Sequence, residues 1–313
     1  MKPLRNRLEE IRRASPVAWE VPERDYALSW ILAGIARTPE LQGLVFKGGT
    51  ALKKCYFGGY RFSEDLDFSA LRHAPAGQAL EQALGLAGEA AVRLASPYAQ
   101  LAVELQRYQE REPHPAGQEA FTFRLGLPWH RGQLRTRVLV EITRDEILQW
   151  PPLLRPILHA YGEDLDNVEI SAYAVEEIVA EKLRALLQQT ARLRSRGWTR
   201  SRARDIYDLW RLLSRAQPMD SGAFVQRLRA KCVPKGVEFA GAADFLQPDL
   251  LEQVRKTWQD WLGPLVAPLP DLDLVLGELR TRLEALLLEP DLATGPAAGG
   301  PPSAPDLGDD PAT

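Results

Sequence analysis

The stretch from Val45 to Ser69 constrains this chain most, because it combines a glycine turn with a pair of acids. Residues 44–46 are apolar and predict a short buried strand that ends at Gly48 and Gly49. Thr50 then begins a short helix. Two residues without side chains, where a strand turns into a helix, let backbone N–H groups approach a phosphate. The sequence therefore predicts a phosphate-binding turn here, although most Gly-Gly pairs form ordinary turns.

Asp65 and Asp67 form the second part of this stretch. Side chains alternate across a strand, so both carboxylates share one face and the apolar residues between and after them share the other. Two like charges about 4 Å apart repel by roughly 4 kcal/mol at an effective dielectric constant near 20, so the pair favours a bound cation. An Asp-x-Asp pair alone is more often a solvated strand edge. Together with the glycine turn, it predicts a nucleotide phosphate held against a divalent metal ion.

The glycine turn and the acid pair resemble known motifs. Gly48-Gly49-Thr50 followed by Ser63-Glu64-Asp65-Leu66-Asp67 is similar to the signature of the polymerase-β-like nucleotidyltransferase superfamily. The longer runs Phe46–Leu52 and Arg61–Asp67 resemble more closely the AbiEii/MenT group of nucleotidyltransferase toxins. A Walker A loop is excluded, because no Gly-Lys-Ser/Thr follows at the required spacing.

The resemblance implies an α+β fold, with an N-terminal polymerase-β-like mixed sheet and flanking helices followed by a mainly helical C-terminal domain. The expected boundary between these two domains lies near Pro151, Pro152 and Pro156. We therefore expect a nucleotidyltransferase-like domain at residues 1–150 and a helical domain that closes the active-site cleft at 151–289. Residues 290–313 contain too few bulky apolar side chains to fold and predict a disordered tail.

Composition narrows the class of protein. The chain has 313 residues and a net charge of −3, so any basic surface that binds nucleic acid must be local. Its two cysteines argue against a disulfide scaffold and favour a reducing cytoplasm, and no apolar run is long enough to cross a membrane. The four histidines are scattered along the chain, which excludes a His-Glu-x-x-His or Cys/His zinc site.

Glu141 lies in the middle of a predicted strand whose other face is formed by Val138, Val140 and Ile142. A carboxylate in so apolar a strand must be paired or metal-bound if it is buried. In polymerase-β-like enzymes a third carboxylate on a neighbouring strand completes the metal site, so the resemblance implies Glu141, with Asp145 as the alternative. An edge-strand glutamate that faces water is the other interpretation.

Lys182 interrupts an apolar stripe that recurs at helical spacing through residues 173–189. The run Glu177–Leu186 resembles a motif of the AbiEii group whose lysine is functional, which implies that Lys182 reaches across to the nucleotide phosphates. A lysine whose ammonium group extends to water is the alternative.

The segment from Arg184 to Arg215 is strongly basic, because it contains nine arginines and two acids. Within it, an Arg-rich loop at 192–204 surrounds Trp198 and is typical of a surface that binds a phosphate backbone and a stacked base. A solvated basic surface is the alternative. The following Arg-Asp-x-Tyr-Asp run resembles the last motif of the AbiEii group and implies that Asp205 is functional, whereas acids at a helix N-terminus are also favoured by the helix dipole.

These residues imply nucleotidyl transfer, in which an acceptor hydroxyl attacks the α-phosphorus of a nucleoside triphosphate (NTP) and pyrophosphate leaves. By the resemblance, Asp65, Asp67 and Glu141 hold Mg²⁺ or Mn²⁺. Lys182 offsets the charge of the triphosphate, and Asp205 orients Lys182 or acts on the acceptor. The residues expected at the nucleotide phosphates are the glycine turn and its neighbours, namely Lys47, Gly48, Gly49, Thr50, Arg61 and Ser63.

The AbiEii/MenT group implies a cytoplasmic toxin that is countered by a separately encoded antitoxin. Some of its members add nucleotides to the 3′ end of tRNA and so block translation, and the Arg-rich loop at 192–204 would suit such an acceptor. Two other interpretations stay open. One is a nucleotidyltransferase that modifies a protein or a small molecule such as an antibiotic, and the other is a non-catalytic binding protein on the same fold.

Overall fold

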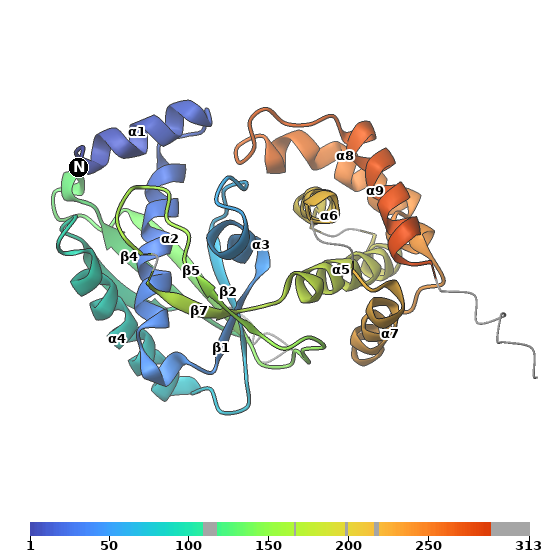
Figure 1. Ribbon diagram of the computed structural model, residues 1–313, viewed down its shortest axis with the longest axis horizontal. Coiled ribbons are helices and arrows are strands. Elements are labelled where there is room, and N and C mark those ends of the chain that lie inside the picture. The colour runs from blue at the N-terminus through green and yellow to red at the C-terminus, as the bar shows by residue number, and fades with distance from the viewer. Residues whose placement is uncertain (109–117, 166, 198–199, 216–218, 289–313) are drawn as a thin grey trace, which may run out of the picture.

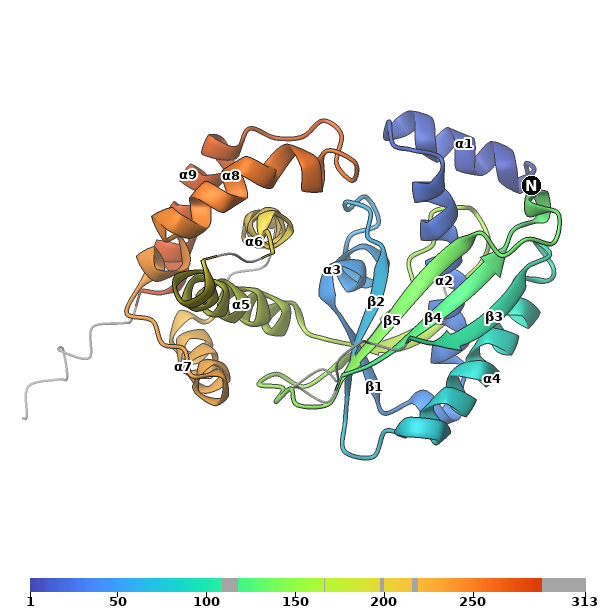
Figure 2. The ribbon, with the colours of Figure 1, turned by 180° about the vertical axis from the view of Figure 1, so that it is seen from behind.

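The computed structural model describes residues 1–108, 118–165, 167–197, 200–215 and 219–288. Within these residues a mixed sheet with flanking helices is followed by a group of helices (Figure 1, and from behind in Figure 2). This arrangement confirms the α+β class with its mainly helical C-terminal part. The tail expected at 290–313 lies outside the described residues.

The described strands form one seven-stranded sheet in the order β3-β4-β5-β2-β1-β7-β6. Their bounds are β1 Leu44–Lys47, β2 Asp65–Ala70, β3 Ala102–Arg107, β4 Glu119–Gly126, β5 Thr136–Thr143, β6 Leu153–Pro156 and β7 Glu169–Ala172. The central strand β2 is antiparallel to β1 and parallel to β5. Because β6 and β7 follow residue 150, the sheet extends past the expected boundary, and the helical part begins at Val175. A division into separate domains stays a prediction.

Two long helices cover one face of the sheet. Helices α2 (Glu20–Ala36) and α4 (Gly77–Ala95) lie behind β3, β4 and β5 in the view of Figure 2. The apolar residues of β2 and β5 that alternate with the acids are fully buried and join α2 in one core. The apolar half of each strand therefore fixes which face carries the acids, as the alternation predicts.

The C-terminal helices pack around a second apolar core, to which Val45, Leu52 and Tyr60 from the sheet region also contribute. These helices are α5 Val175–Arg196, α6 Ala203–Arg215, α7 Ser221–Cys232, α8 Pro248–Leu262 and α9 Leu272–Leu286. The remaining helical elements are α1 Leu4–Ala14, α3 Gly48–Ala51, the π-helical turn η2 Leu52–Tyr56, and the short 3-10 turns η1 Pro39–Leu41, η3 Pro128–His130, η4 Val233–Lys235 and η5 Ala242–Phe245.

The loop expected at 192–204 is wrong in its first part, because α5 continues to Arg196. Leucine and arginine are good helix formers, so the basic residues extend the helix instead of breaking it. Gly197, with φ of +74°, then ends it in the left-handed conformation that glycine adopts most easily. Trp198 lies outside the described residues.

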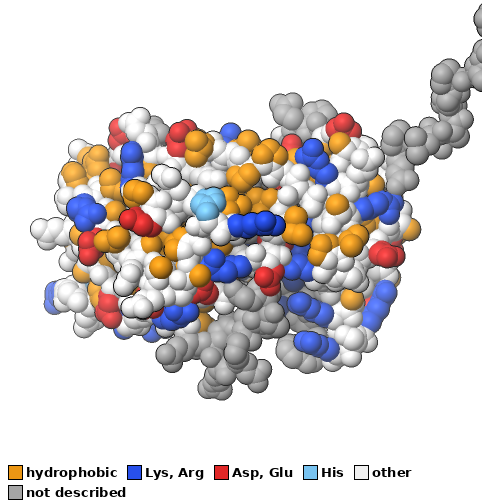
Figure 3. Space-filling model, turned by 90° about the horizontal axis from the view of Figure 1, so that it is seen from below, with side chains coloured by type: hydrophobic (Ala, Val, Ile, Leu, Met, Phe, Trp, Pro, Cys, Tyr) orange, Lys and Arg blue, Asp and Glu red, His pale blue; other side chains and the backbone are white. Residues whose placement is uncertain are grey.

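The face of the molecule shown in Figure 3 carries no single dominant charge. Basic, acidic and apolar side chains are intermixed on it, in agreement with the small net charge. None of the helices in the described ranges is both long and apolar enough to cross a membrane.

Candidate active site

Three acids share one open face of the sheet. The register between β2 and β5 sets Asp67 beside Glu141 and Asp65 beside Leu139, so all three carboxylates project from the same side. Their carboxylates have no hydrogen bond or ion pair to any residue that the structure describes. Burial, and then repulsion from Glu141, raises the pKa of Asp65 to about 6 and that of Asp67 to about 7. This face therefore holds negative charge that a cation would neutralise.

The glycine turn lies directly against the acid pair. Gly48 has φ of +77°, and a Cβ atom on it would stand 2.4 Å from the Oδ2 atom of Asp67. A Cβ atom on Gly49 would stand 2.4 Å from the Nη2 atom of Arg61. Both contacts are far closer than van der Waals packing permits, so the backbone can approach these two charged side chains only because both residues are glycine.

Thr50 differs from its neighbours in the predicted phosphate site. Its hydroxyl is buried and donates a hydrogen bond to the main-chain carbonyl of Asp65 at 2.5 Å. The residue is not part of the cavity wall formed by the acids and the glycine turn. Thr50 thus holds the start of β2 in place, whereas Ser63 does line the cavity, as a phosphate contact would require.

Lys182 enters the site from α5 and is held by two carboxylates of α6. Its ammonium group lies 2.8 Å from Asp205 and 2.7 Å from Asp208. Burial alone would lower the pKa of Lys182, but the two carboxylates outweigh it and raise that pKa, so the lysine stays charged. Burial likewise opposes ionisation of Asp205, yet Lys182 and Arg202 hold its pKa well below the usual range.

Arg61 is engaged more strongly than the sequence suggests. Its Nε and Nη2 atoms both donate to the carboxylate of Asp208 at 2.7 Å, and the two side chains are 3% and 0% exposed. A bidentate pair of this kind is geometrically specific and strong. Asp208, which the sequence analysis left without a role, therefore joins the segment before β2 to helix α6.

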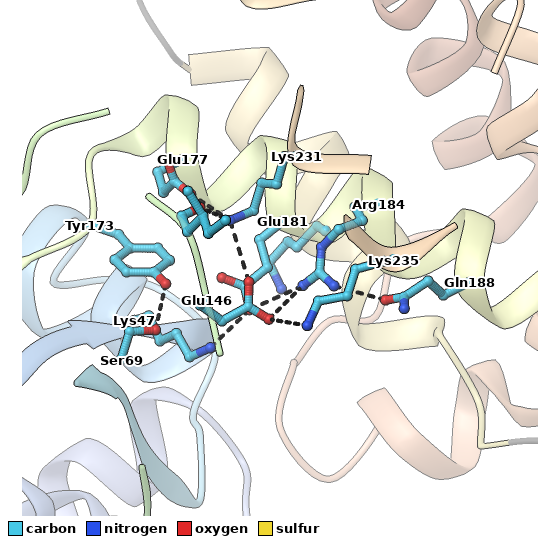
Figure 4. A network of polar contacts seen from close by, with 12 residues as sticks. Lys47, Ser69, Glu146, Tyr173, Glu177, Glu181, Arg184, Gln188, Lys231 and Lys235 are labelled. Atoms are coloured by element: carbon cyan, nitrogen blue, oxygen red, sulfur yellow. Dashed lines mark hydrogen bonds and ion pairs between the residues drawn. The ribbon is translucent and has the colours of Figure 1, made fainter. Parts of the chain in front are cut away.

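Lys47 belongs to a polar network that connects the sheet to the helices (Figure 4). Its Nζ atom lies 3.1 Å from the Oε1 atom of Glu181. Burial alone would raise the pKa of Glu181, but the positive charges of Lys47 and Lys231 outweigh it and lower that pKa to about 2. Glu146 continues the network, at 3.2 Å from Arg184 and 3.6 Å from Lys231. Lys47 still lines the cavity, so its charge remains beside the acid pair.

One cavity of about 450 Å³ brings most of the predicted site together. Of the residues named from the sequence, those that line it are Lys47, Gly48, Gly49, Arg61, Ser63, Asp65, Asp67, Glu141, Lys182 and Asp205. Asp145, the alternative third acid, is exposed and lies outside this wall. Of the described part of the Arg-rich segment, the last residues reach this wall, among them Arg202 and Arg204.

Several residues of this cavity were not predicted from the sequence as site residues. Trp261 of α8 lies at the wall with Arg204 above its ring, 5.4 Å from the ring centre. Glu181 precedes Lys182 in α5, and Gln118 adjoins β4. The position of Glu181 directly before Lys182 was a signal in the sequence that could have identified it. The sequence gives no such signal for Trp261, because its spacing in a helical stripe is that of a packing residue.

The donor set fits a divalent cation by its chemistry. Carboxylate oxygens are the ligands that Mg²⁺ and Mn²⁺ prefer, and the carboxylates at 65, 67 and 141 face one space with no hydrogen bond or ion pair to any described residue. In the described ranges no three acidic, histidine or cysteine side chains are already close enough to hold a metal ion. The fit therefore rests on the shared face and the chemistry of these three side chains.

Comparison with known proteins identifies the family. The family described as "Nucleotidyl transferase AbiEii toxin, Type IV TA system" matches residues 30–287. Among solved structures, the chain is similar to an antigenic nucleotidyltransferase-like protein from Paracoccidioides brasiliensis, with 15% identity, coverage of 74% of this chain and 93% of that chain, and a TM-score of 0.39. No curated protein matches. The family match spans most of the sequence, and the chain therefore belongs to the AbiEii nucleotidyltransferase toxin family of type IV toxin–antitoxin systems.

Proposed function

We propose that this protein is a cytoplasmic, metal-dependent nucleotidyltransferase that transfers a nucleoside monophosphate from an NTP to the 3′ end of tRNA and thereby blocks translation. The observation that carries the proposal is the cavity in which the acid pair, the glycine turn and Lys182 meet. Family membership supports the reaction class and an antitoxin partner. The acceptor and the metal dependence are the parts that need an experiment.

Asp65, Asp67 and Glu141 would hold Mg²⁺ or Mn²⁺ in this proposal. When bound, the metal ion supplies a lower pKa for the acceptor hydroxyl and neutralises charge on the departing pyrophosphate. The three acids contribute by their position, since they project from adjacent strands on one rigid sheet. Thr50 supports them from behind, because its hydrogen bond fixes the backbone of Asp65.

Lys182 would bind the triphosphate. A lysine ammonium group has three N–H donors, and Asp205 and Asp208 use two of them. The third donor is left for a phosphate oxygen, on the side of the ammonium group that faces the cavity. Asp205 would then orient Lys182, and Asp208 would orient both Lys182 and Arg61 from the buried side.

Basic groups on the helical side of the cavity favour a nucleic acid acceptor over a small neutral one. Arg202 and Arg204 reach the wall from the start of α6, and Trp261 offers a ring surface beside them. Arginine next to an accessible aromatic ring is the usual means of holding a phosphate and an unpaired base.

The decisive experiment identifies the acceptor molecule to which a radioactive nucleotide is transferred. The full chain is incubated with each [α-³²P]NTP, Mg²⁺ or Mn²⁺, and total tRNA. We expect label on tRNA and none on tRNA whose 3′ diol has been destroyed by periodate. Asp65→Asn should reduce transfer at least 100-fold, whereas Asp145→Asn, a matched change outside the cavity, should leave it unchanged.

Other outcomes would replace the proposal. Label on protein, or on an added aminoglycoside alone, would favour the alternative nucleotidyltransferase with a different acceptor. Absence of transfer to all acceptors, with every NTP and both metals, would favour a binding protein on this fold.

A further inference from the structure

A second cavity of about 290 Å³ lies outside the catalytic cavity, and nothing in the proposed reaction uses it. We call it the indole pocket. Two tryptophan rings and a group of charged side chains form its wall, and the principal members are Trp19, Glu23, Arg24, Trp129, Arg135 and Arg137. It opens where the start of α2, the turn η3 and the first residues of β5 meet.

The two rings of the indole pocket are held by one buried acid. The Nε1 atoms of Trp19 and Trp129 donate to the same Oε1 atom of Glu23, at 2.5 and 2.6 Å. His130 lies 3.4 Å from that oxygen. The ring centres are 6.1 Å apart with 56° between their planes. Because all three groups meet at Oε1, this one oxygen of Glu23 fixes the positions of both rings.

Arginines give the pocket a positive rim. Arg135 and Arg137 are exposed, and Arg137 has no hydrogen bond or ion pair to any residue that the structure describes. Arg24 lies between this rim and the catalytic cavity. Arg135 donates to Gln133 and Arg24 to Glu64, so Arg137 is the arginine of this rim whose guanidinium group can bind a ligand without losing a partner among the described residues. Fixed aromatic faces beside such a guanidinium group suit a ligand that has both a flat ring and negative charge, which describes a nucleotide.

A chain of contacts joins the indole pocket to the catalytic cavity. Arg24 donates to one oxygen of Glu64 at 2.8 Å, and Arg204 donates to the other at 2.7 Å. Glu64 precedes Asp65, and Arg204 covers the ring of Trp261 in the catalytic wall. The two cavities therefore lie on either side of this bridge, in which Glu64 joins an arginine of each cavity.

The separation suits a short strand. Arg137 and Glu141 share one face of β5 and are four residues apart, which is about 13 Å at roughly 3.3 Å per residue. Four stacked nucleotides at roughly 3.4 Å each span the same distance. A strand whose 3′ end reaches the acids would place a nucleotide a few positions upstream at the indole pocket.

We propose that the indole pocket binds an unpaired upstream nucleotide of a single-stranded RNA acceptor, with its base against Trp129 and its phosphate at Arg137. This inference rests on the proposed function for the direction of the strand and for the choice of RNA. A base within a duplex is excluded, because its faces are already stacked and cannot enter a concave pocket.

The test measures binding separately from catalysis. Fluorescence anisotropy of a 5′-fluorescein-labelled, eight-nucleotide single-stranded RNA gives the Kd for the full chain at several salt concentrations, without NTP or metal. Trp129→Leu should raise the Kd by about 5- to 100-fold with an unchanged salt slope, because it removes stacking only. Arg137→Gln should reduce the slope of log K against log salt by about 0.7, which corresponds to one lost phosphate contact.

Controls make each outcome decisive. Arg93→Gln on α4, a 68% exposed side chain on the opposite face of the sheet, should change neither quantity, and thermal melts should show that all three variants fold. Wild-type affinity in the Trp129 and Arg137 variants would overturn the inference, as would no binding by the wild type or equal binding of a duplex. The two proposals fail separately. Transfer to tRNA with unchanged variant affinities refutes only the pocket, whereas the predicted binding pattern without any transfer refutes only the reaction.

Discussion

Replacing Gly48 by alanine tests whether the glycine turn exists to let the backbone approach the acid pair. Two separate penalties are expected. Alanine in the left-handed region costs about 1–2 kcal/mol of the free energy of unfolding. The new Cβ atom would also stand 2.4 Å from the Oδ2 atom of Asp67, so the carboxylate must rotate away. A displacement of about 1 Å at a catalytic group can reduce the rate about 100-fold.

Gly236 provides the matched control. Its φ is +63°, close to that of Gly48, but a Cβ atom there would meet nothing within 4 Å. Gly236→Ala should therefore lose about the same 1–2 kcal/mol and keep its activity. Urea denaturation gives the free energy of unfolding, and label transfer at saturating NTP gives the rate.

Comparing the two variants separates the effect of backbone strain from the effect of displacing the Asp67 carboxylate. Gly48→Ala should lose about 100-fold in rate beyond any loss in the Gly236 variant. Equal rates in the two variants would show that the close approach to Asp67 has no catalytic purpose, and the reasoning from the turn would be refuted.

Three further predictions follow from the buried charges and the acid pair. Lys182→Met should lower the free energy of unfolding by about 1.5–3 kcal/mol and abolish transfer, because Asp205 and Asp208 lose a shared cation but keep Arg202 and Arg61, respectively. Lys256→Met at an exposed pair should change stability by less than about 1 kcal/mol in the same urea titration. Protons compete with metal ions at Asp65 and Asp67, whose pKa values are about 6 and 7, so the Mn²⁺ affinity measured by calorimetry should rise from pH 6 to pH 8. Asp67→Asn should weaken Mn²⁺ binding and reduce its dependence on pH. An affinity that does not change with pH in the wild type would contradict the raised pKa values. Thr50→Val should lower stability by about 1 kcal/mol with the KM for NTP unchanged, and a raised KM would restore Thr50 as a phosphate contact.

Much of the architecture could be predicted because its signals are local. Alternation along β2 and β5 fixed which face carries the acids, and helical spacing fixed the face of α5 that carries Lys182. The family resemblance supplied the order of these elements and the mixed sheet. The strands β6 and β7 were beyond reach, since four-residue strands close to prolines leave no periodic pattern to read.

The parts of the site that could not be predicted depend on long-range partners. Arg61 looked like a phosphate contact, but its partner Asp208 is 147 residues away in sequence. Trp261 lies in a region without motifs and gains its position only when α8 packs beside α6. Spacing rules describe neighbours along a chain, and these contacts arise from packing between elements.

The Arg61–Asp208 pair has a consequence for how substrates enter and leave. A hinge motion that parted the helices from the sheet would separate Arg61 from Asp208, whereas Lys182 of α5 would move together with Asp208 of α6. Breaking the buried Arg61–Asp208 pair costs about 3–5 kcal/mol. We therefore expect the helices and the sheet to stay joined during turnover, so that nucleotide exchange occurs without a hinge opening between them. Nucleotide would then enter and leave through the cavity while the Arg61–Asp208 pair stays intact.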